Sequence, residues 1–278
     1  MRTIMIAAEL QNKLYILKNI IQDYSPVAVA FSGGVDSTFL LKLAHDCLGG
    51  NATAVTAAAP NFAPDEIADA IGFCKSEAIR HLIVYLGDSF LGILEDNPLN
   101  RCYICKGHIF KTLRAHPELI GMRLIDGTNA DDTLDFRPGE KALRELGVKS
   151  PLKEAGLSKG EIRAALRDMG LPVWNKPAFA CLASRIPYGE KITYEKLNSI
   201  YSLEKTLRES GFSQVRVRHH GDTARIEVMP GERNRFFDTD FMDKINEAAK
   251  GAGFVYAALD LGGYSMGSLN PSEKGGLT

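Results

Sequence analysis

Six consecutive residues, Ser32-Gly-Gly-Val-Asp-Ser37, combine the types that bind a phosphate group. Gly33 and Gly34 let the backbone turn sharply and come close to an anion. An apolar run precedes them and a helical pattern follows, so the N–H groups and positive dipole end of a helix would face that anion. Ser32 and Ser37 add hydroxyl donors, whereas the carboxylate of Asp36 suits Mg²⁺ or orients the loop. The segment predicts a phosphate-binding loop; a glycine-rich turn without a ligand is the alternative.

Three of the five cysteines are candidates for chemistry. Cys102-Tyr-Ile-Cys105 places two thiols on one face of an expected helix start, and Cys181 follows in a separate segment. Cys47 and Cys74 lie in amphipathic helices, where a cysteine acts as a small hydrophobe. Spacing alone leaves three possibilities open: a redox disulfide, a zinc site with His108 as fourth ligand, or an iron–sulfur site with three thiolates.

The loop and the cysteine pair fall within an alternating series of helices and strands. Apolar spacing predicts helices over 6–22, 38–48, 64–79 and 102–116, and strands over 27–31, 52–59, 81–86 and 123–126. Strands that alternate with helices form a parallel sheet, and ligands bind at the carboxyl ends of its strands. We therefore expect an α/β fold with the loop after its first strand.

The pattern changes after about residue 185. Helices are predicted over 193–210 and 232–249, and strands over 214–218, 224–228 and 254–258. The first two of these strands alternate apolar and polar residues, as half-buried strands do. We expect two domains: residues 1–185, and a smaller α+β domain of residues 186–278 for substrate binding or oligomerisation.

Composition and charge narrow the classes of protein. The 278 residues are 45% hydrophobic and 24% charged, as in ordinary globular proteins, and the net charge of −1 lacks the basic excess of a nucleic-acid binder. The apolar N-terminal run is interrupted before it reaches signal-peptide length, and no stretch approaches a membrane span. We therefore expect a cytoplasmic protein with neither membrane nor nucleic acid as a partner. Five cysteines in a chain this long do not indicate a disulfide framework.

The six-residue loop resembles the PP-loop signature of the N-type ATP pyrophosphatases, and it lacks the Gly-Lys-Ser/Thr of a Walker A loop. The resemblance implies an adenine nucleotide alpha hydrolase-like parallel sheet. It also implies that ATP is cleaved between its α- and β-phosphates and that AMP passes to the substrate. Relatives hold the adenosine after later strands, where this chain has Ala57, Gly127 and Asn129.

A second set of motifs comprises the segment 175–189, Arg137-Pro-Gly139, Val215-Arg-Val-Arg218, Ala224-Arg-Ile-Glu227 and Leu259-Asp-Leu-Gly-Gly263. These motifs resemble those of the LarE family, the sulfur transferases that build the nickel-pincer nucleotide of lactate racemase. With the loop, they extend from about residue 25 to 265. The resemblance implies a small-molecule nucleotide substrate, a pyridinium dicarboxylate mononucleotide whose carboxylates are adenylated and then converted to thiocarboxylates.

Members of that family differ in how sulfur reaches the substrate. Some sacrifice the sulfur of a cysteine whose position aligns with Ala180, so that Cys181 lies one residue later. Others carry three cysteines and resemble [4Fe–4S]-dependent thiolation enzymes. Cys102, Cys105 and Cys181 fit the second version, in which one iron stays open to a sulfide. We expect ATP, Mg²⁺ and a [4Fe–4S] cluster as cofactors, with sacrificial transfer from Cys181 as the alternative.

The resemblance also suggests tasks for basic side chains. Arg185, Arg216 and Arg218 are candidates for the substrate's 5′-phosphate, because guanidinium groups suit phosphate oxygens and residues 216 and 218 share one face of a strand. Lys106 is a candidate for stabilising charge that develops during catalysis. Solvated arginines on a sheet face and a solvated lysine are the alternatives. Relatives form homo-oligomers, and we expect one here; the sulfide donor is not assigned.

Three other functions use the same loop. A tRNA thiolation enzyme would need a tRNA-binding domain or a basic surface, which the sequence lacks. Amidation with ammonia would leave the cysteines without a task. A module that senses ATP or AMP would explain the loop alone. Thiolation of tRNA is therefore the alternative that uses both the loop and the cysteines.

Overall fold

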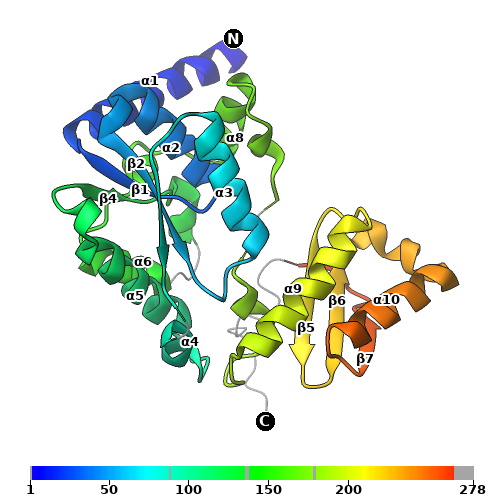
Figure 1. The fold of residues 1–278 in the computed structure, drawn as a ribbon. Helices are drawn as coiled ribbons and strands as arrows, with labels where there is room; N and C mark the ends of the chain where they lie inside the picture. Colours follow the sequence, from blue (N-terminus) through cyan, green and yellow to red (C-terminus); the bar gives the residue numbers. More distant parts are fainter. Residues whose placement is uncertain (1, 88, 135–137, 178–179, 266–278) are drawn as a thin grey trace. The chain divides into compact units, whose positions relative to one another are not determined.

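The computed structural model describes residues 2–87, 89–134, 138–177 and 180–265. The chain divides into two compact units, each of which is described by itself (Figure 1). Unit 1 comprises Met1–Ile93 and Asn100–Phe179, and unit 2 comprises Leu94–Leu99 and Ala180–Thr278. The second unit therefore includes a short segment from the first half of the sequence.

Unit 1 is built on a four-stranded parallel sheet with the strand order β3-β2-β1-β4. The strands are β1 (Val27–Ala30), β2 (Ala52–Ala58), β3 (His81–Tyr85) and β4 (Arg123–Ile125). From β1 the chain first runs toward β3 and then returns to β4 on the other side. In such sheets ligands bind where the direction reverses, which here is at the carboxyl ends of β1 and β4. The predicted parallel α/β sheet is confirmed.

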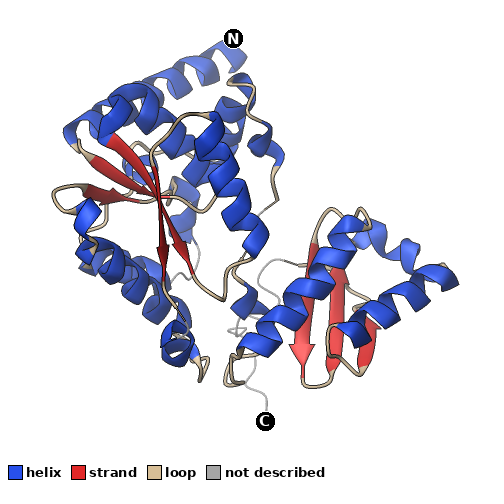
Figure 2. Cartoon of the chain, in the orientation of Figure 1, coloured by secondary structure: helices blue, strands red, loops and turns tan. Residues whose placement is uncertain are grey.

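Helices cover both faces of this sheet (Figures 1 and 2). They are α1 (Arg2–Asp23), α2 (Val35–Leu48), α3 (Pro64–Ser76), α5 (Arg101–Ala115), α6 (Pro138–Glu145), α7 (Pro151–Glu154) and α8 (Lys159–Asp168). A further helix, α4 (Ser89–Leu94), ends at the first residue assigned to unit 2. The main core lies where α1, α2, α3 and α8 meet β1 and β2. Its fully buried side chains include Leu17, Val29, Phe39 and Leu166. The regularly spaced apolar residues of the sequence are therefore those on the buried faces of the helices and strands.

Unit 2 contains a three-stranded mixed sheet with the order β5-β6-β7. Strand β5 (Val215–His220) pairs antiparallel with β6 (Thr223–Val228), and β6 pairs parallel with β7 (Tyr256–Leu259). Helix α9 (Tyr194–Glu209) contacts β5, and α10 (Thr239–Gly251) contacts both α9 and β7. The smaller α+β fold predicted for the second part is confirmed.

Several boundaries differ from the prediction. The helix predicted over 232–249 is wrong in its first part, because Pro230–Phe237 is 3-10 helix and α10 begins at Thr239. Asp238 ends the first segment, since its side chain accepts a hydrogen bond from Phe241 N (2.8 Å) and caps α10. The short helices α4, α6, α7 and α8 were not anticipated by apolar spacing. None of the described helices is long and apolar enough to cross a bilayer.

Candidate functional site

The phosphate loop is a tight turn between β1 and α2. Gly33 has a φ of +67°, in the left-handed region that favours glycine. Gly34 precedes α2, and the first hydrogen bond of the helix runs from Thr38 N to Gly34 O (2.9 Å). No side chain caps this helix by a hydrogen bond. The N–H groups of the first turn are therefore unused within the helix, and the positive end of its dipole points the same way.

The two serines of the loop hold its shape. Ser37 Oγ donates to Gly34 O (3.2 Å) and accepts from Ser32 N (3.3 Å). The two hydroxyl oxygens lie 3.1 Å apart. Both serine hydroxyls are therefore engaged in hydrogen bonds within the loop. The backbone N–H groups remain as the main donors for a ligand.

The turn after β4 packs against the start of α2 at Gly127. A Cβ atom at this position would lie 2.9 Å from Ser37 N and 3.1 Å from Ser37 Cα, both backbone atoms. Because glycine has no Cβ, it allows the two backbone segments to lie this close without moving either of them. Next to it, Asp126 accepts hydrogen bonds from Thr128 Oγ1 and Ser150 Oγ, each 2.6 Å long. This network fixes the β4 turn beside the loop at the point where the sheet reverses direction.

Asp36 lies in the first turn of α2 and is largely buried. Its Oδ2 accepts from Lys159 Nζ (2.5 Å), whereas its Oδ1 is buried and has no hydrogen-bond partner among the described residues. Burial raises the pKa of Asp36 above its ordinary value, and the positive charge of Lys159 only partly offsets this. An orphaned carboxylate oxygen beside a phosphate loop fits the coordination of Mg²⁺, which prefers oxygen ligands.

Two further nucleotide candidates lie in or just after the two strands that flank β1. Ala57 is in β2, at the carboxyl half of the strand. Asn129 is 2% exposed, and its Oδ1 accepts from Asp131 N (2.9 Å) while its backbone N donates to Asp132 Oδ2 (3.1 Å). Both belong to unit 1, as the loop does. Ala57 lies in β2 and Asn129 follows β4, and both of these strands pair with β1.

Cys102 and Cys105 lie in the first turn and a half of α5 in unit 1. Cys105 is 9% exposed, and the Nδ2 of Asn61 lies 3.9 Å from its sulfur. In contrast, burial raises the pKa of Cys74 to about 12, and it raises the pKa of Cys47 as well. Cys74 and Cys105 are buried, whereas Cys47 and Cys102 are half-buried, so the assignment of Cys102 and Cys105 as ligands stays a prediction.

Lys106 and the start of α6 pack closely beside the cysteine pair. A Cβ at Gly139 would lie 2.7 Å from Lys106 Cδ and 3.3 Å from Cys102 O, so the Lys106 side chain would have to shift to admit one. A hydrogen bond from Lys153 holds the pKa of Glu140 below its ordinary value, and the charge of Lys106 contributes to this. Arg137, the first residue of the same motif, lies outside the described residues.

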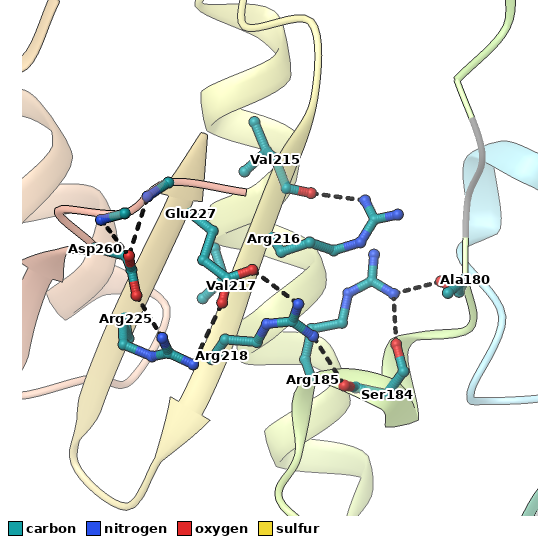
Figure 3. A network of polar contacts seen from close by, with 12 residues as sticks. Ala180, Ser184, Arg185, Val215, Arg216, Val217, Arg218, Arg225, Glu227 and Asp260 are labelled. Atoms are coloured by element: carbon teal, nitrogen blue, oxygen red, sulfur yellow. Dashed lines mark hydrogen bonds and ion pairs between the residues drawn. The ribbon is translucent and has the colours of Figure 1, made fainter. Parts of the chain in front are cut away.

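Cys181 belongs to unit 2, where Arg185 holds its backbone. Figure 3 shows the neighbouring hydrogen bonds from Arg185 to Ala180 and Ser184. Arg185 Nη1 donates to the carbonyl oxygens of Ala180 and Cys181 and to Ser184 Oγ (3.0 Å). The guanidinium group of Arg185 also pairs with the carboxylate of Glu204. Its Nε donates to Oε1 (2.8 Å) and its Nη2 donates to Oε2 (3.1 Å). Arg185 and Glu204 are each 1% exposed. We call this arrangement the Arg185–Glu204 bracket, and it holds the cysteine segment against α9.

The bracket also reaches β5. Glu204 Oε1 accepts from Val217 N (3.0 Å) on β5, which is an edge strand of its sheet. Burial acts to raise the pKa of Glu204, but the charge and hydrogen bonds of Arg185 outweigh it and hold that pKa below its ordinary value. The carboxylate is therefore charged, and the segment 180–185 is tied to the strand that carries Arg216 and Arg218.

Arg216 and Arg218 share one face of β5 as predicted, and both are buried rather than solvated. Arg218 pairs with Glu227 on β6 (2.8 Å) and donates to Ser184 O (3.1 Å). Arg216 lies over the ring of Tyr264, 5.2 Å from its centroid. Burial lowers the pKa of Arg216 to about 10, and the positive charge of Arg185 adds to this effect. Three buried guanidinium groups thus lie close to two buried carboxylates, those of Glu204 and Glu227. Figure 3 shows the three guanidinium groups with Glu227.

The described residues contain no group of three or more His, Cys, Asp or Glu side chains arranged to hold a metal ion. The three cysteines predicted as cluster ligands belong to two different units. Sequence reasoning missed Lys159, Asn61, Glu204 and Glu227. A signal existed for Lys159, because Ser158 and Glu161 form a capping box that marks the start of α8.

Comparisons with known proteins show close relatives over the whole chain. No family model matches. An uncharacterized protein of Synechocystis is 41% identical over 262 residues, covering 94% of this chain and 98% of the relative. The pyridinium-3,5-bisthiocarboxylic acid mononucleotide synthase of Lactiplantibacillus plantarum is 36% identical over 268 residues, or 95% of each chain. A glutamine-hydrolyzing GMP synthase of Clostridium novyi is 27% identical over 226 residues, which covers 73% of this chain but 43% of that enzyme.

Proposed function

Because this chain belongs to the family of the pyridinium-3,5-bisthiocarboxylic acid mononucleotide synthases, the LarE family, we propose that it uses ATP to convert the carboxylates of a pyridinium mononucleotide into thiocarboxylates. The identity of 36% over 95% of both chains carries the proposal. The geometry of the phosphate loop supports the use of ATP, since an uncapped helix start and two glycines meet at the reversal point of the sheet.

In the first step a substrate carboxylate oxygen attacks the α-phosphorus of ATP. The bond to the β-phosphate oxygen breaks, so pyrophosphate leaves and a mixed anhydride with AMP remains. The backbone N–H groups of Val35 and its neighbours in the first turn of α2 are suited to the polyphosphate chain. Asp36 is proposed to hold Mg²⁺ through its orphaned Oδ1, and Mg²⁺ offsets the charge on the departing pyrophosphate. Ala57, Gly127 and Asn129 are proposed to contact the adenosine.

In the second step a sulfur nucleophile forms a bond to the activated carbonyl carbon while the C–O bond to AMP breaks. Cys102, Cys105 and Cys181 are proposed to hold a [4Fe–4S] cluster. Three thiolates would satisfy three irons of such a group, and a buried amide of Asn61 lies beside Cys105. When bound, the cluster supplies a sulfide on the iron that no protein thiolate holds. Lys106 is proposed to stabilise negative charge on the carbonyl oxygen.

The substrate's 5′-phosphate is proposed to lie against the buried arginines of unit 2. The three buried guanidinium groups outnumber the two buried carboxylates there, and the same carboxylates also pair with Arg208 and Arg225, so positive charge is in excess. Arg216 and Arg218 are the proposed phosphate ligands. Arg185 is engaged by Glu204 and by two carbonyl oxygens. We therefore propose that it mainly positions Cys181, and that any phosphate contact it makes is secondary.

The test uses purified protein with ATP, Mg²⁺, sulfide and the pyridinium dicarboxylate mononucleotide under anaerobic conditions. We expect AMP and pyrophosphate to appear only with substrate, together with a product in which oxygen is exchanged for sulfur. Replacing Asp36 by Asn should abolish pyrophosphate release while the protein remains folded. Thiolation of tRNA without any reaction of the mononucleotide would overturn the proposal in favour of the tRNA enzyme.

A further inference from the structure

Lys176 contacts the phosphate loop from a segment that the proposed reaction does not use. Its Nζ donates to Gly33 O (3.1 Å) within the loop and pairs with Asp69 Oδ2 on α3 (2.8 Å). All three residues belong to unit 1, so these contacts do not depend on how the two units are placed. The lysine side chain is 19% exposed and therefore lies mostly away from water. Its ammonium group is thus a charged donor held against the backbone of the loop.

The bond to Gly33 O sets the direction of the next backbone N–H group. In a planar trans peptide the carbonyl oxygen and the following N–H point in opposite directions. Because Gly33 O points to Lys176, the N–H of Gly34 points away from this lysine. Gly34 directly precedes α2, so this N–H adjoins the N–H groups of the first turn of the helix. A phosphate group at the start of α2 would meet all of these donors only in this orientation of the peptide.

The peptide between Gly33 and Gly34 is easily rotated without such a contact. Glycine adopts positive and negative φ angles about equally readily, so the two glycines do not by themselves fix the peptide. A cavity of about 320 Å³ adjoins the contact and is lined by Gly33, Lys176, Phe73 and Val173 among others. Packing on this side of the loop is therefore incomplete. A hydrogen bond from a charged donor is stronger than one between neutral groups, and Lys176 supplies the restraint that packing leaves out.

Arg163 on α8 holds the backbone that carries Lys176. Its guanidinium group donates to the carbonyl oxygens of Trp174 and Lys176, the second at 2.9 Å. The backbone N of Lys176 donates to Val173 O (2.9 Å). Ordering a lysine side chain costs conformational entropy. These contacts fix the base of the side chain before a ligand arrives, so that part of this cost is met by the fold.

We propose that Lys176 is a positioning residue of the phosphate site, which holds the peptide between Gly33 and Gly34 so that the Gly34 N–H donates to a phosphate group of ATP. The inference rests on the proposed function, because it takes ATP as the ligand of the loop. Lys176 acts through the backbone and needs no contact of its own with the nucleotide. Its loss should therefore weaken binding of the phosphates and leave binding of the nucleoside unchanged.

Three variants separate the contact with the loop from the ion pair and from the loss of a lysine as such. Lys176→Met keeps the apolar stem of the side chain without its charged donor. Asp69→Asn removes the charge of the other partner and leaves the bond to Gly33 O in place. Lys42→Met is the matched control, because Lys42 lies on α2, its side chain is 23% exposed, and it pairs with two carboxylates outside the loop, at 2.7 and 3.2 Å. Thermal unfolding without ligand checks that each variant folds.

The measurement is isothermal titration calorimetry of the full-length protein with ATP and Mg²⁺, and separately with adenosine. In Lys176→Met we expect ATP binding to weaken about 10- to 150-fold, as for one lost hydrogen bond to a charged group. Adenosine lacks phosphates, so its dissociation constant should match that of the parent. Lys42→Met and Asp69→Asn should bind ATP as the parent does, because ion pairs with an exposed carboxylate contribute little.

The outcomes separate the inference from the proposed function. Parent-like ATP binding in Lys176→Met would overturn the inference and leave the proposed function intact. Equal weakening of ATP and adenosine would show a general distortion of the site, and an equal loss in Asp69→Asn would assign the effect to the ion pair; either result would overturn the inference as well. A parent protein that binds no ATP would overturn the proposed use of ATP, and the inference with it.

A second measurement decides if Lys176→Met does not fold. In the parent labelled with ¹⁵N-glycine, the amide resonance of Gly34 should shift when ATP and Mg²⁺ are added, because its N–H then donates to a phosphate oxygen. A Gly34 resonance that does not move while ATP binds would overturn the inference.

Discussion

Gly127→Ala adds one methyl group at the closest approach between the β4 turn and the start of α2. The new Cβ would lie 2.9 Å from Ser37 N, 3.1 Å from Ser37 Cα and 3.2 Å from Asp36 C. Favourable contacts between such atoms are about 3.5–4.0 Å long, so the helix start must move by roughly half an ångström. All three atoms are backbone, so no side-chain rotation relieves the clash. The φ of Gly127 lies outside the left-handed region, and the effect is therefore steric.

Overpacking of this kind costs about 1–3 kcal/mol of stability, which a domain of this size tolerates. The larger effect should be on ATP, because the N–H groups of α2 no longer face the phosphates. The loss of one charge-assisted hydrogen bond, about 1.5–3 kcal/mol, weakens binding about 10- to 150-fold. Isothermal titration calorimetry with ATP and Mg²⁺ measures this directly.

Gly72→Ala is the control for this substitution. Gly72 lies within α3, and a Cβ there would meet nothing within 4 Å. Alanine in a helix should stabilise the protein by about 0.5–1 kcal/mol and leave ATP binding unchanged. If Gly127→Ala bound ATP with the affinity of the parent, the turn after β4 would not support the phosphate site and our reasoning would be refuted.

Three further predictions concern buried charges. Glu204→Gln breaks the buried pair with Arg185 and should lower the free energy of unfolding by about 3–5 kcal/mol; an unchanged urea midpoint would show that the Arg185–Glu204 bracket does not stabilise the fold. Arg216→Ala should weaken substrate binding by about 1.5–3 kcal/mol and leave ATP binding unchanged; calorimetry that found equal losses for both ligands would place Arg216 at the ATP site. Burial raises the pKa of Asp36 above 3.8, so the folded state binds this proton more tightly than the unfolded state. Relative to Asp36→Asn, the stability of the parent should therefore fall as the pH rises from 3.8 through the raised pKa, and a stability difference that does not change with pH in Mg²⁺-free denaturation would contradict this.

The sequence predicted the phosphate loop and its sheet because the relevant interactions are local. Two glycines, a β-type run before them and a helical run after them are contiguous in the chain, so the turn from β1 to α2 follows from short-range rules. The proximity of Gly127 to Ser37 depends instead on strand order. Alternation predicts a parallel sheet, but it does not say that β4 pairs with β1.

The buried charges of unit 2 were harder to predict. Arg185, Arg216 and Arg218 were expected to meet phosphate, and their burial against carboxylates was not anticipated. A signal was present in α9, where Leu197, Ile200, Glu204 and Leu207 follow the spacing of a buried stripe. A charged residue on such a stripe needs a buried partner. The sequence pattern could therefore have flagged Glu204, although only the fold identifies Arg185 as its partner.

The division of the chain also depends on contacts that are distant in sequence. Residues 94–99 belong to unit 2, because Asn97 Nδ2 donates to the carbonyl oxygens of Ile186 (3.2 Å) and Pro187 (2.7 Å). These bonds link positions about ninety residues apart, and no local pattern indicates them. The assignment of functions to the two units stays a prediction.

The central claim is that sulfur comes from outside the polypeptide while the cysteines remain intact. Intact-mass analysis of the protein after turnover with ATP, substrate and sulfide tests it most directly. We predict that all five cysteines keep their sulfur and that each chain forms more than one equivalent of thiocarboxylate. A loss of H₂S from the protein, located as dehydroalanine at Cys181 and matched one-to-one with product sulfur, would contradict the cluster mechanism and establish the sacrificial one.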